Sequence, residues 1–246
     1  MVRNIDSQER ENEILGLIIE SYIEQSKPIS SAYLCDNHKL NCSPATIRNV
    51  MLSLERKGLI SHIHTSSGRV PTKQGFKHYV ESLKQEELQK QQPSNLDFHS
   101  LPESNIEEAI NYSLDSLASL SGYASLIAVS GQDERFSYRG MRFILEQPEF
   151  EDISKLRHII YALEVRMIDF QHLLFDYIDE NIKILIGDEI GFEEISDCSL
   201  IVSGIHEKGV ALSLALLGPM RMNYSKAASC LNSVRNQLRE VVEEFV

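Results

Sequence analysis

The 246-residue sequence has few of the features that secreted, membrane-spanning or catalytic proteins need. Its four cysteines are scattered without paired spacing, and no cationic leader with an apolar run opens the chain. It also lacks any apolar run of about 18 residues, the length that a transmembrane helix needs. A disulfide framework requires paired cysteines, and a secretory signal requires a cationic leader followed by an apolar run. We therefore expect a reduced, cytoplasmic protein without membrane association.

Motifs for catalysis are also missing. The sequence contains no nucleophile elbow, no glycine-rich loop that could cradle a phosphate, and no metalloprotease-type pair of histidines. Adjacent carboxylates occur at 188–189 and 193–194, but such pairs are more typical of a plain surface than of acid–base catalysis. We expect no enzyme activity and no cofactor.

One N-terminal segment gathers potential zinc ligands: Cys35, His38, Cys42, His62 and His64. Their spacing fits no common zinc finger, and Cys35 falls on a predicted helix beside an apolar residue. Buried thiols and surface histidines are the better interpretation, so we expect no metal.

Residues 41–79 carry the most informative pattern that is present. Ser43 can cap a helix, Pro44 suits its first position, and Gly58 is typical of the residue after a helix end. Apolar residues spaced by three and four predict one buried face: Ile47, Val50, Met51 and Leu54.

The opposite face of this helix is polar, with Thr46, Arg48 and Asn49 near its start. Arginine pairs bidentately with guanine and asparagine with adenine, while small side chains at Ala45 and Thr46 allow close approach to a base edge. The alternative is the solvated polar face of an ordinary core helix.

A hairpin with a polar tip follows the helix. Residues 59–63 alternate in polarity as a half-buried strand does, and residues 69–71 can return beside them. The tip is rich in groups suited to phosphate oxygens or a minor groove. They are His64, Thr65, Ser66, Gly68 and Arg69.

The next helix is predicted to begin after Thr72 and carries Lys73 and Lys77 four residues apart. This pair is suited to phosphate contact or, alternatively, to solubility alone. Residues 27–84 hold nine Lys and Arg against three Asp and Glu, a formal charge of +6 in a chain of net charge −12. A basic island in an acidic protein is typical of nucleic-acid binding.

The element order predicts two domains. Helix, turn, short helix, capped helix, hairpin and basic helix make a winged helix-turn-helix over 1–88. The polar, proline-broken segment 89–102 is interpreted as a linker, in a polar stretch that begins near Gln85. Residues 103–246 mix predicted strands and helices and favour an α+β domain. Its strands are expected at 124–130, 142–145, 182–186, 198–205 and 210–217, with helices at 103–120, at 150–178 and from Tyr224.

The sequence resembles the heat-inducible transcription repressor family, HrcA. The N-terminal motifs are residues 43–51, 64–72, 75–76 and 79–80; the C-terminal blocks are residues 145–150, 186–189, 197–200 and 217–225. The resemblance implies a reduced GAF-like C-terminal domain, a homodimer, and repression of chaperone operons through the CIRCE inverted repeat of double-stranded DNA. It also implies the GroE chaperonin as a partner, and no enzymatic activity.

The resemblance carries over the DNA-reading residues Ser43, Pro44, Ala45, Thr46, Arg48 and Asn49, together with the wing residues above. One departure stands out. Only residues 131–139 lie where typical members have an inserted dimerising domain of roughly a hundred residues, so dimerisation is expected to use another face, such as the helix 224–246, or to be lost. Two alternatives remain: a regulator whose GAF-like domain senses a small molecule, and a winged helix used for protein or RNA contact.

Overall fold

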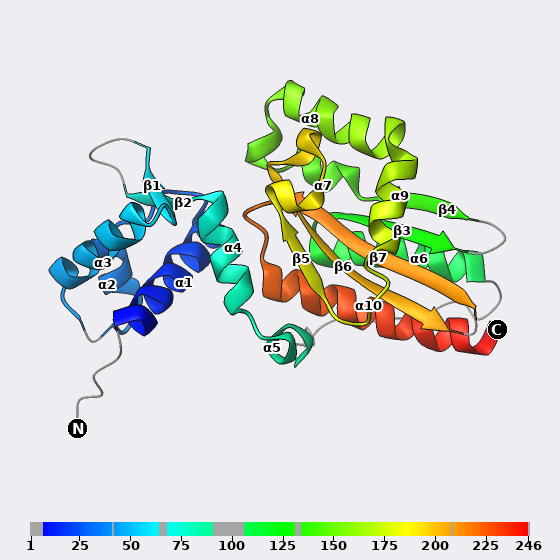
Figure 1. Ribbon diagram of the computed structural model, residues 1–246, viewed down its shortest axis with the longest axis horizontal. Helices are drawn as coiled ribbons and strands as arrows, with labels where there is room; N and C mark the ends of the chain where they lie inside the picture. Colours follow the sequence, from blue (N-terminus) through cyan, green and yellow to red (C-terminus); the bar gives the residue numbers. More distant parts are fainter. Residues whose placement is uncertain are drawn as a thin grey trace. The chain divides into compact units, whose positions relative to one another are not determined.

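The protein is described by a computed structural model, which covers residues 7–40, 42–63, 68–90, 106–130, 134–207 and 209–245. It consists of two compact units, Met1–Leu83 and Lys84–Val246 (Figure 1). The wing-tip residues His64, Thr65 and Ser66, and most of the expected linker, lie outside the described residues.

The first unit has the element order expected from the sequence. Its elements are α1 (Ser7–Gln25), α2 (Ser31–Asn37), α3 (Pro44–Arg56), β1 (Ile60–His62), β2 (Arg69–Pro71) and α4 (Lys73–Ser82). Three of the helices begin at a hydroxyl cap. Ser30, Ser43 and Thr72 each accept a hydrogen bond from the backbone N–H three residues later, which satisfies a donor that the first helical turn leaves open.

The core of the first unit forms where α1 meets α3 and α4. Fully buried apolar side chains dominate it: Ile14, Leu15, Ile18, Ile19, Leu34, Ile47, Leu54, Ile60 and Phe76. The spacing of three and four on α1 and α3 gives each helix one buried stripe, so α3 is fixed against α1 while its other side stays in solvent.

The second unit is built on a five-stranded antiparallel sheet in the order β4-β3-β7-β6-β5. Its strands are β3 (Ala124–Ser130), β4 (Arg135–Arg139), β5 (Lys183–Ile186), β6 (Cys198–Glu207) and β7 (Val210–Pro219). Its helices are α5 (Gln85–Lys90), α6 (Ile106–Ser121), α7 (Met141–Leu145), η1 (Pro148–Phe150), α8 (Ile153–Ile160), the π-helix η2 (Tyr161–Val165), α9 (Met167–Phe175), η3 (Gly187–Ile190), η4 (Glu193–Ile195) and α10 (Tyr224–Phe245). A helix-covered antiparallel sheet confirms the α+β class.

Alternate residues of each strand serve opposite faces of this sheet. Leu126 and Val202 belong to one apolar core, together with Ile159 of α8 and Phe170 of α9. The opposite face is covered by α6 and α10 (Figure 1), and there the Ser125 hydroxyl donates to the carbonyl oxygen of Leu114 in α6. Helices therefore protect both faces of the sheet.

The predicted strand at 142–145 is wrong, because these residues belong to helix α7. The strand at this place is β4, where Phe136 and Tyr138 alternate with polar residues and the chain pairs with β3. A left-handed residue, Gly140, then turns the chain out of the sheet. Four residues are too few for periodicity to distinguish a strand from one turn of helix.

Two further boundaries differ from expectation. The first unit ends at Leu83 rather than after residue 88, and Gln85–Lys90 forms a helix that belongs to the second unit. Within that unit the Gln85 amide donates to the carbonyl oxygen of Ile182 at 2.6 Å and accepts from its N–H at 3.2 Å. The polar composition of this segment, which suggested a linker, hides the buried residue Leu88.

Candidate nucleic-acid interface

Helix α3 presents a continuous exposed stripe. Pro44, Ala45, Arg48 and Asn49 are exposed and Thr46 is half-buried, whereas Ile47, Met51 and Leu54 face the core. The structure thus brings together the side chains that the sequence assigned to the start of this helix. A helix projecting small residues, an amide and a guanidinium from one side has the shape and donors needed to read base edges in a major groove.

The start of α3 is fixed by Ser43. Its hydroxyl accepts from the Thr46 N–H at 3.2 Å and lies 3.0 Å from the Thr46 hydroxyl. The cap thus uses the Ser43 side chain within the protein, while neighbouring N–H groups of the first turn remain directed outward.

The hairpin beside α3 is anchored to the segment before α2. Ile29 and Arg69 exchange two backbone hydrogen bonds, of 2.8 and 2.7 Å, which form an isolated antiparallel bridge to β2. A side chain at Gly68 would lie 2.6 Å from the backbone of Ile29. Gly68, assigned from the sequence to the wing, is therefore required for this close approach.

The Arg69 side chain is half-buried and pairs within the protein. Its guanidinium bonds the Glu55 carboxylate at 3.0 Å, and His62 contacts the other oxygen of the same carboxylate. These contacts hold the pKa of Glu55 below its usual range, the His62 hydrogen bond contributing most. The arrangement ties the end of α3 to both strands of the hairpin, so Arg69 positions the wing rather than projecting from it.

The buried carboxylate of Glu11 ties α3 to α1. Glu11 accepts a hydrogen bond from the Ser53 hydroxyl at 2.7 Å and pairs with Lys57, and these contacts lower its pKa. On α4, Lys73 and Lys77 are half-buried. Lys57 and Arg69 therefore pair with carboxylates inside this unit, and Arg48 and Arg56 are the arginines that α3 exposes.

Sequence reasoning missed Leu52, whose exposed fraction is 41%. It lies four residues after Arg48 and three after Asn49, in the middle of the exposed stripe of α3. The spacing alone contained this signal, because Leu52 falls outside the predicted buried face and shares the polar side with Arg48 and Asn49. An exposed apolar group at this place is suited to contact with a thymine methyl.

The described residues contain no cluster of three metal-binding side chains. His38 instead lies 3.2 Å from the Ser21 hydroxyl, and burial is the main reason that the pKa of the Cys42 thiol is raised. Among the described residues, no helix has both the length and the apolar character that crossing a membrane requires.

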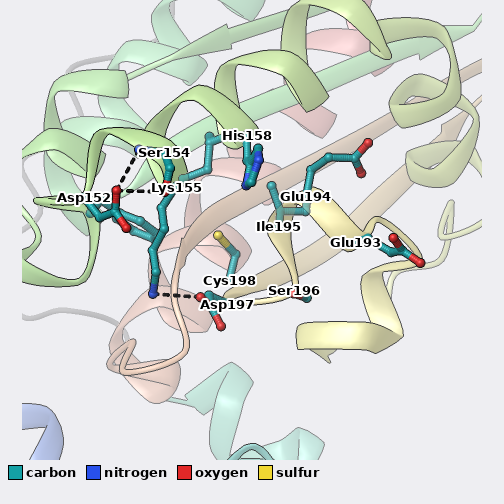
Figure 2. Close-up of a pocket in the computed structure, with 12 residues that line it drawn as sticks. Asp152, Ser154, Lys155, His158, Glu193, Glu194, Ile195, Ser196, Asp197 and Cys198 are labelled. Carbon is teal, nitrogen blue, oxygen red and sulfur yellow. Dashed lines mark hydrogen bonds and ion pairs between the residues drawn. The ribbon is translucent and has the colours of Figure 1, made fainter.

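The second unit contains an open pocket of about 350 Å³ between α8 and η4 (Figure 2). Lys155 reaches across it to Asp197 at 2.8 Å, and Asp152 caps α8 by accepting from Ser154 at 2.8 Å. Burial raises the pKa of the Cys198 thiol to about 12, so this thiol is protonated at neutral pH. Among the charged residues that line the pocket, Lys155 and Asp197 pair with each other, and Glu194 pairs with Arg166 outside the lining.

Blocks that are distant in the sequence meet in this unit. Arg221 pairs with Glu149 at 2.6 Å and donates to Gln147 at 3.2 Å. The Tyr123 hydroxyl accepts from the Asn223 N–H at 2.9 Å. The loop between β7 and α10 is therefore a structural corner in which the family-like blocks 145–150 and 217–225 hold each other.

The two units together define a transcription regulator, with a solvent-facing third helix and hairpin in one unit and a helix-covered sheet in the other. The sequence-family model named "HrcA protein C terminal domain" matches residues 45–228 of this chain. The chain therefore belongs to the HrcA family. A relative from Symbiobacterium thermophilum, "Heat-inducible transcription repressor HrcA", is 25% identical over 339 residues, which cover 96% of this chain and 99% of that protein.

Two more likenesses agree with this assignment. A relative of the same name from Prosthecochloris aestuarii is 48% identical over 82 residues, 33% of this chain and 23% of that protein. The crystal structure of a hypothetical protein superposes with a TM-score of 0.81 at 20% identity, covering 96% of this chain and 99% of that one, and supports the fold. The Symbiobacterium alignment spans 339 positions, 93 more than the 246 residues of this chain.

Proposed function

We propose that this protein represses chaperone operons by binding an inverted-repeat operator of the CIRCE type. In this proposal the first unit is the DNA-binding domain and the second is the regulatory and dimerising domain. The observation that carries the proposal is the exposed stripe of α3, where Arg48 and Asn49 project beside Ala45 without a protein partner among the described residues. The names of the relatives support the same assignment.

The proposal gives the residues of the first unit different roles. Arg48 and Asn49 read base edges, and Ala45 and Pro44 allow the start of α3 to enter the major groove. The wing residues 64–68, together with Lys73 and Lys77 on α4, contact the backbone. Base contacts give specificity and phosphate contacts give affinity and register. Two copies bind together, because the half-sites of a palindrome match a two-fold axis in the protein.

A titration of the full chain onto a labelled CIRCE duplex and onto a scrambled duplex of equal length tests this function. Fluorescence anisotropy at fixed salt measures both affinities, since the electrostatic part of binding changes with salt. We expect specific binding at least a thousandfold tighter than binding to the scrambled duplex. Equal affinity for the two duplexes would contradict the proposal.

The GroE chaperonin is proposed as the modulator that keeps the repressor folded and competent. Titration of operator with protein refolded in the presence and absence of chaperonin measures the active fraction. We expect that fraction to rise when chaperonin is present and to fall again when an unfolded competitor protein occupies it. If the active fraction changes neither with chaperonin nor with the competitor protein, the chaperonin part of the proposal is wrong. The operator-binding part would be unaffected.

A further inference from the structure

Apolar side chains are exposed along the outer side of α8, η2 and α9, the helical layer in Figure 1 that carries the labels α8 and α9. Each is between 40% and 66% exposed: Ile153, Ile160, Tyr161, Val165, Met167 and Ile168. The inner side of the same helices is fully buried against the sheet through Ile159, Ala162 and Leu163. A helix that is apolar on both sides is typically covered on both.

The outer apolar face, residues 153–168, contains Lys155 and Arg166, which form ion pairs elsewhere in the chain, and two exposed charges of opposite sign at matching positions. Arg157 and Glu164 are both exposed, and they lie at equal distance along the chain from its centre at Ile160 and Tyr161. The Tyr138 hydroxyl donates to Glu164 at 3.1 Å, which holds that carboxylate at the face. Within the described residues, Arg157 has no ion-pair partner in its own chain.

Such an arrangement is complementary to itself. If two copies cross antiparallel about the centre of α8 and η2, Arg157 of each copy meets Glu164 of the other, and the contact occurs twice. Ile160 and Tyr161 then meet their equivalents on the two-fold axis. An interface of this kind uses the same patch on both subunits, which is the commonest way in which a soluble protein forms a dimer.

We propose that the outer apolar face is the surface through which two copies of this chain dimerise. The inference rests on the proposed function for its purpose, because an inverted repeat requires two DNA-binding units. The balanced charges favour a second copy over a strongly acidic or basic partner, which would set a like charge against Arg157 or Glu164. The helix 224–246, considered from the sequence as a dimer surface, instead buries its apolar side within its own unit, through residues such as Leu231 and Leu238.

The face is already formed in the single chain. Arg166 ends the π-helix, stacks on the Phe192 ring at 4.5 Å, and pairs with Asp169 at 3.0 Å and with Glu194 at 3.3 Å. These contacts fix the junction between η2 and α9, where Val165 and Ile168 project. A preformed surface loses less conformational entropy on association.

Sedimentation equilibrium of the full chain without DNA tests the proposal. We expect the wild type to be a dimer and Val165→Glu to raise the dimer dissociation constant at least about tenfold. The single reversals Arg157→Glu and Glu164→Arg weaken the dimer, and the double variant recovers it because each new pair forms across the interface. Glu240→Arg, an exposed charge on α10, is the matched control and leaves the dimer unchanged.

Thermal unfolding of each variant shows whether it is folded, since all of the substituted side chains are exposed. A wild type that is monomeric, or a dimer that is insensitive to Val165→Glu and to both reversals, would overturn the proposal. Binding of each variant to a duplex with a single half-site distinguishes failure of the proposed dimer interface from failure of the proposed operator-binding function. Loss of the dimer with half-site binding retained supports both, whereas loss of the dimer in a protein that never selects the operator supports the interface and contradicts the proposed function.

Discussion

At the scale of single residues, the most consequential side chain of the first unit is Glu55. It bonds Arg69 and His62 and thereby joins the recognition helix α3 to the hairpin. Sequence reasoning placed Arg69 among the DNA-contacting residues, but it could not see that a carboxylate fourteen residues earlier already occupies the guanidinium. Which basic residues are exposed was decided by contacts between elements.

Replacing Glu55 by glutamine should make the stability of the protein less dependent on pH. The pKa of Glu55 is lowered in the folded protein, so its ionised form stabilises the fold above the ordinary glutamate pKa. This contribution is lost as the pH falls through the lowered value. We expect Glu55→Gln to cost roughly 0.5–1 kcal/mol at pH 7.

Denaturant unfolding at pH 7 and at about pH 3, below the ordinary glutamate pKa of about 4.3, measures the effect. The difference in the free energy of unfolding between wild type and Glu55→Gln should shrink toward the lower pH. A difference that stays constant would show that the carboxylate charge contributes nothing to the link between α3 and the hairpin.

Arg48→Ala should relax specificity at one base position of each half-site. Loss of a bidentate contact to guanine costs about 1–3 kcal/mol, and substitution of that base in the operator should then have no further effect. Lys73→Ala is the comparison, because a phosphate contact weakens all sequences equally. Anisotropy titrations with a set of single-base operator variants measure both patterns. Unchanged operator affinity in Arg48→Ala would exclude α3 as the reading helix.

At the scale of elements, helix α4 depends on a close approach to Leu59, the residue just before β1. A Cβ at Gly75 would lie 2.0 Å from the carbonyl oxygen of Leu59, whereas one at Gly16 in α1 would meet only the Tyr79 ring at 3.9 Å. Both glycines lie within helices, where glycine costs about 0.5–1 kcal/mol relative to alanine.

The two alanine substitutions should therefore act in opposite directions. Gly75→Ala is expected to destabilise the first unit by about 1–3 kcal/mol, because backbone atoms must move apart. Gly16→Ala is expected to stabilise it by up to about 1 kcal/mol. Denaturant midpoints measure both changes. Equal effects from the two variants would mean that α4 does not pack against Leu59 as closely as described.

At the scale of the whole molecule, binding to an inverted repeat should depend on the rotational phase of its half-sites. We expect the insertion of about five base pairs, half of a ~10.5-base-pair turn, to weaken binding at least about tenfold, because the DNA-binding unit of the second copy can no longer reach its half-site. Gel-shift titrations with operators of altered spacing measure this. Indifference to spacing would indicate two copies that bind independently.

The sequence alone determined the elements whose ends are set by local chemistry. Ser43, Pro44 and Gly58 delimit α3 through capping and backbone preference, and Thr72 starts α4, since these effects need no distant partner. Long alternating or apolar runs likewise predicted β3, β6 and β7. The resemblance of separated motifs then predicted the family, which the comparisons confirmed.

Only the tertiary structure decided which side chains remain available. Residues 142–145 became a helix because β4 already occupied the sheet edge beside β3. Arg69 forms an ion pair with Glu55. Leu52 and Val165 are exposed to solvent, although their residue types are typical of a core. Local propensity specifies where a helix begins and ends, but the side of it that faces solvent depends on what packs against it, and that is a property of the folded chain.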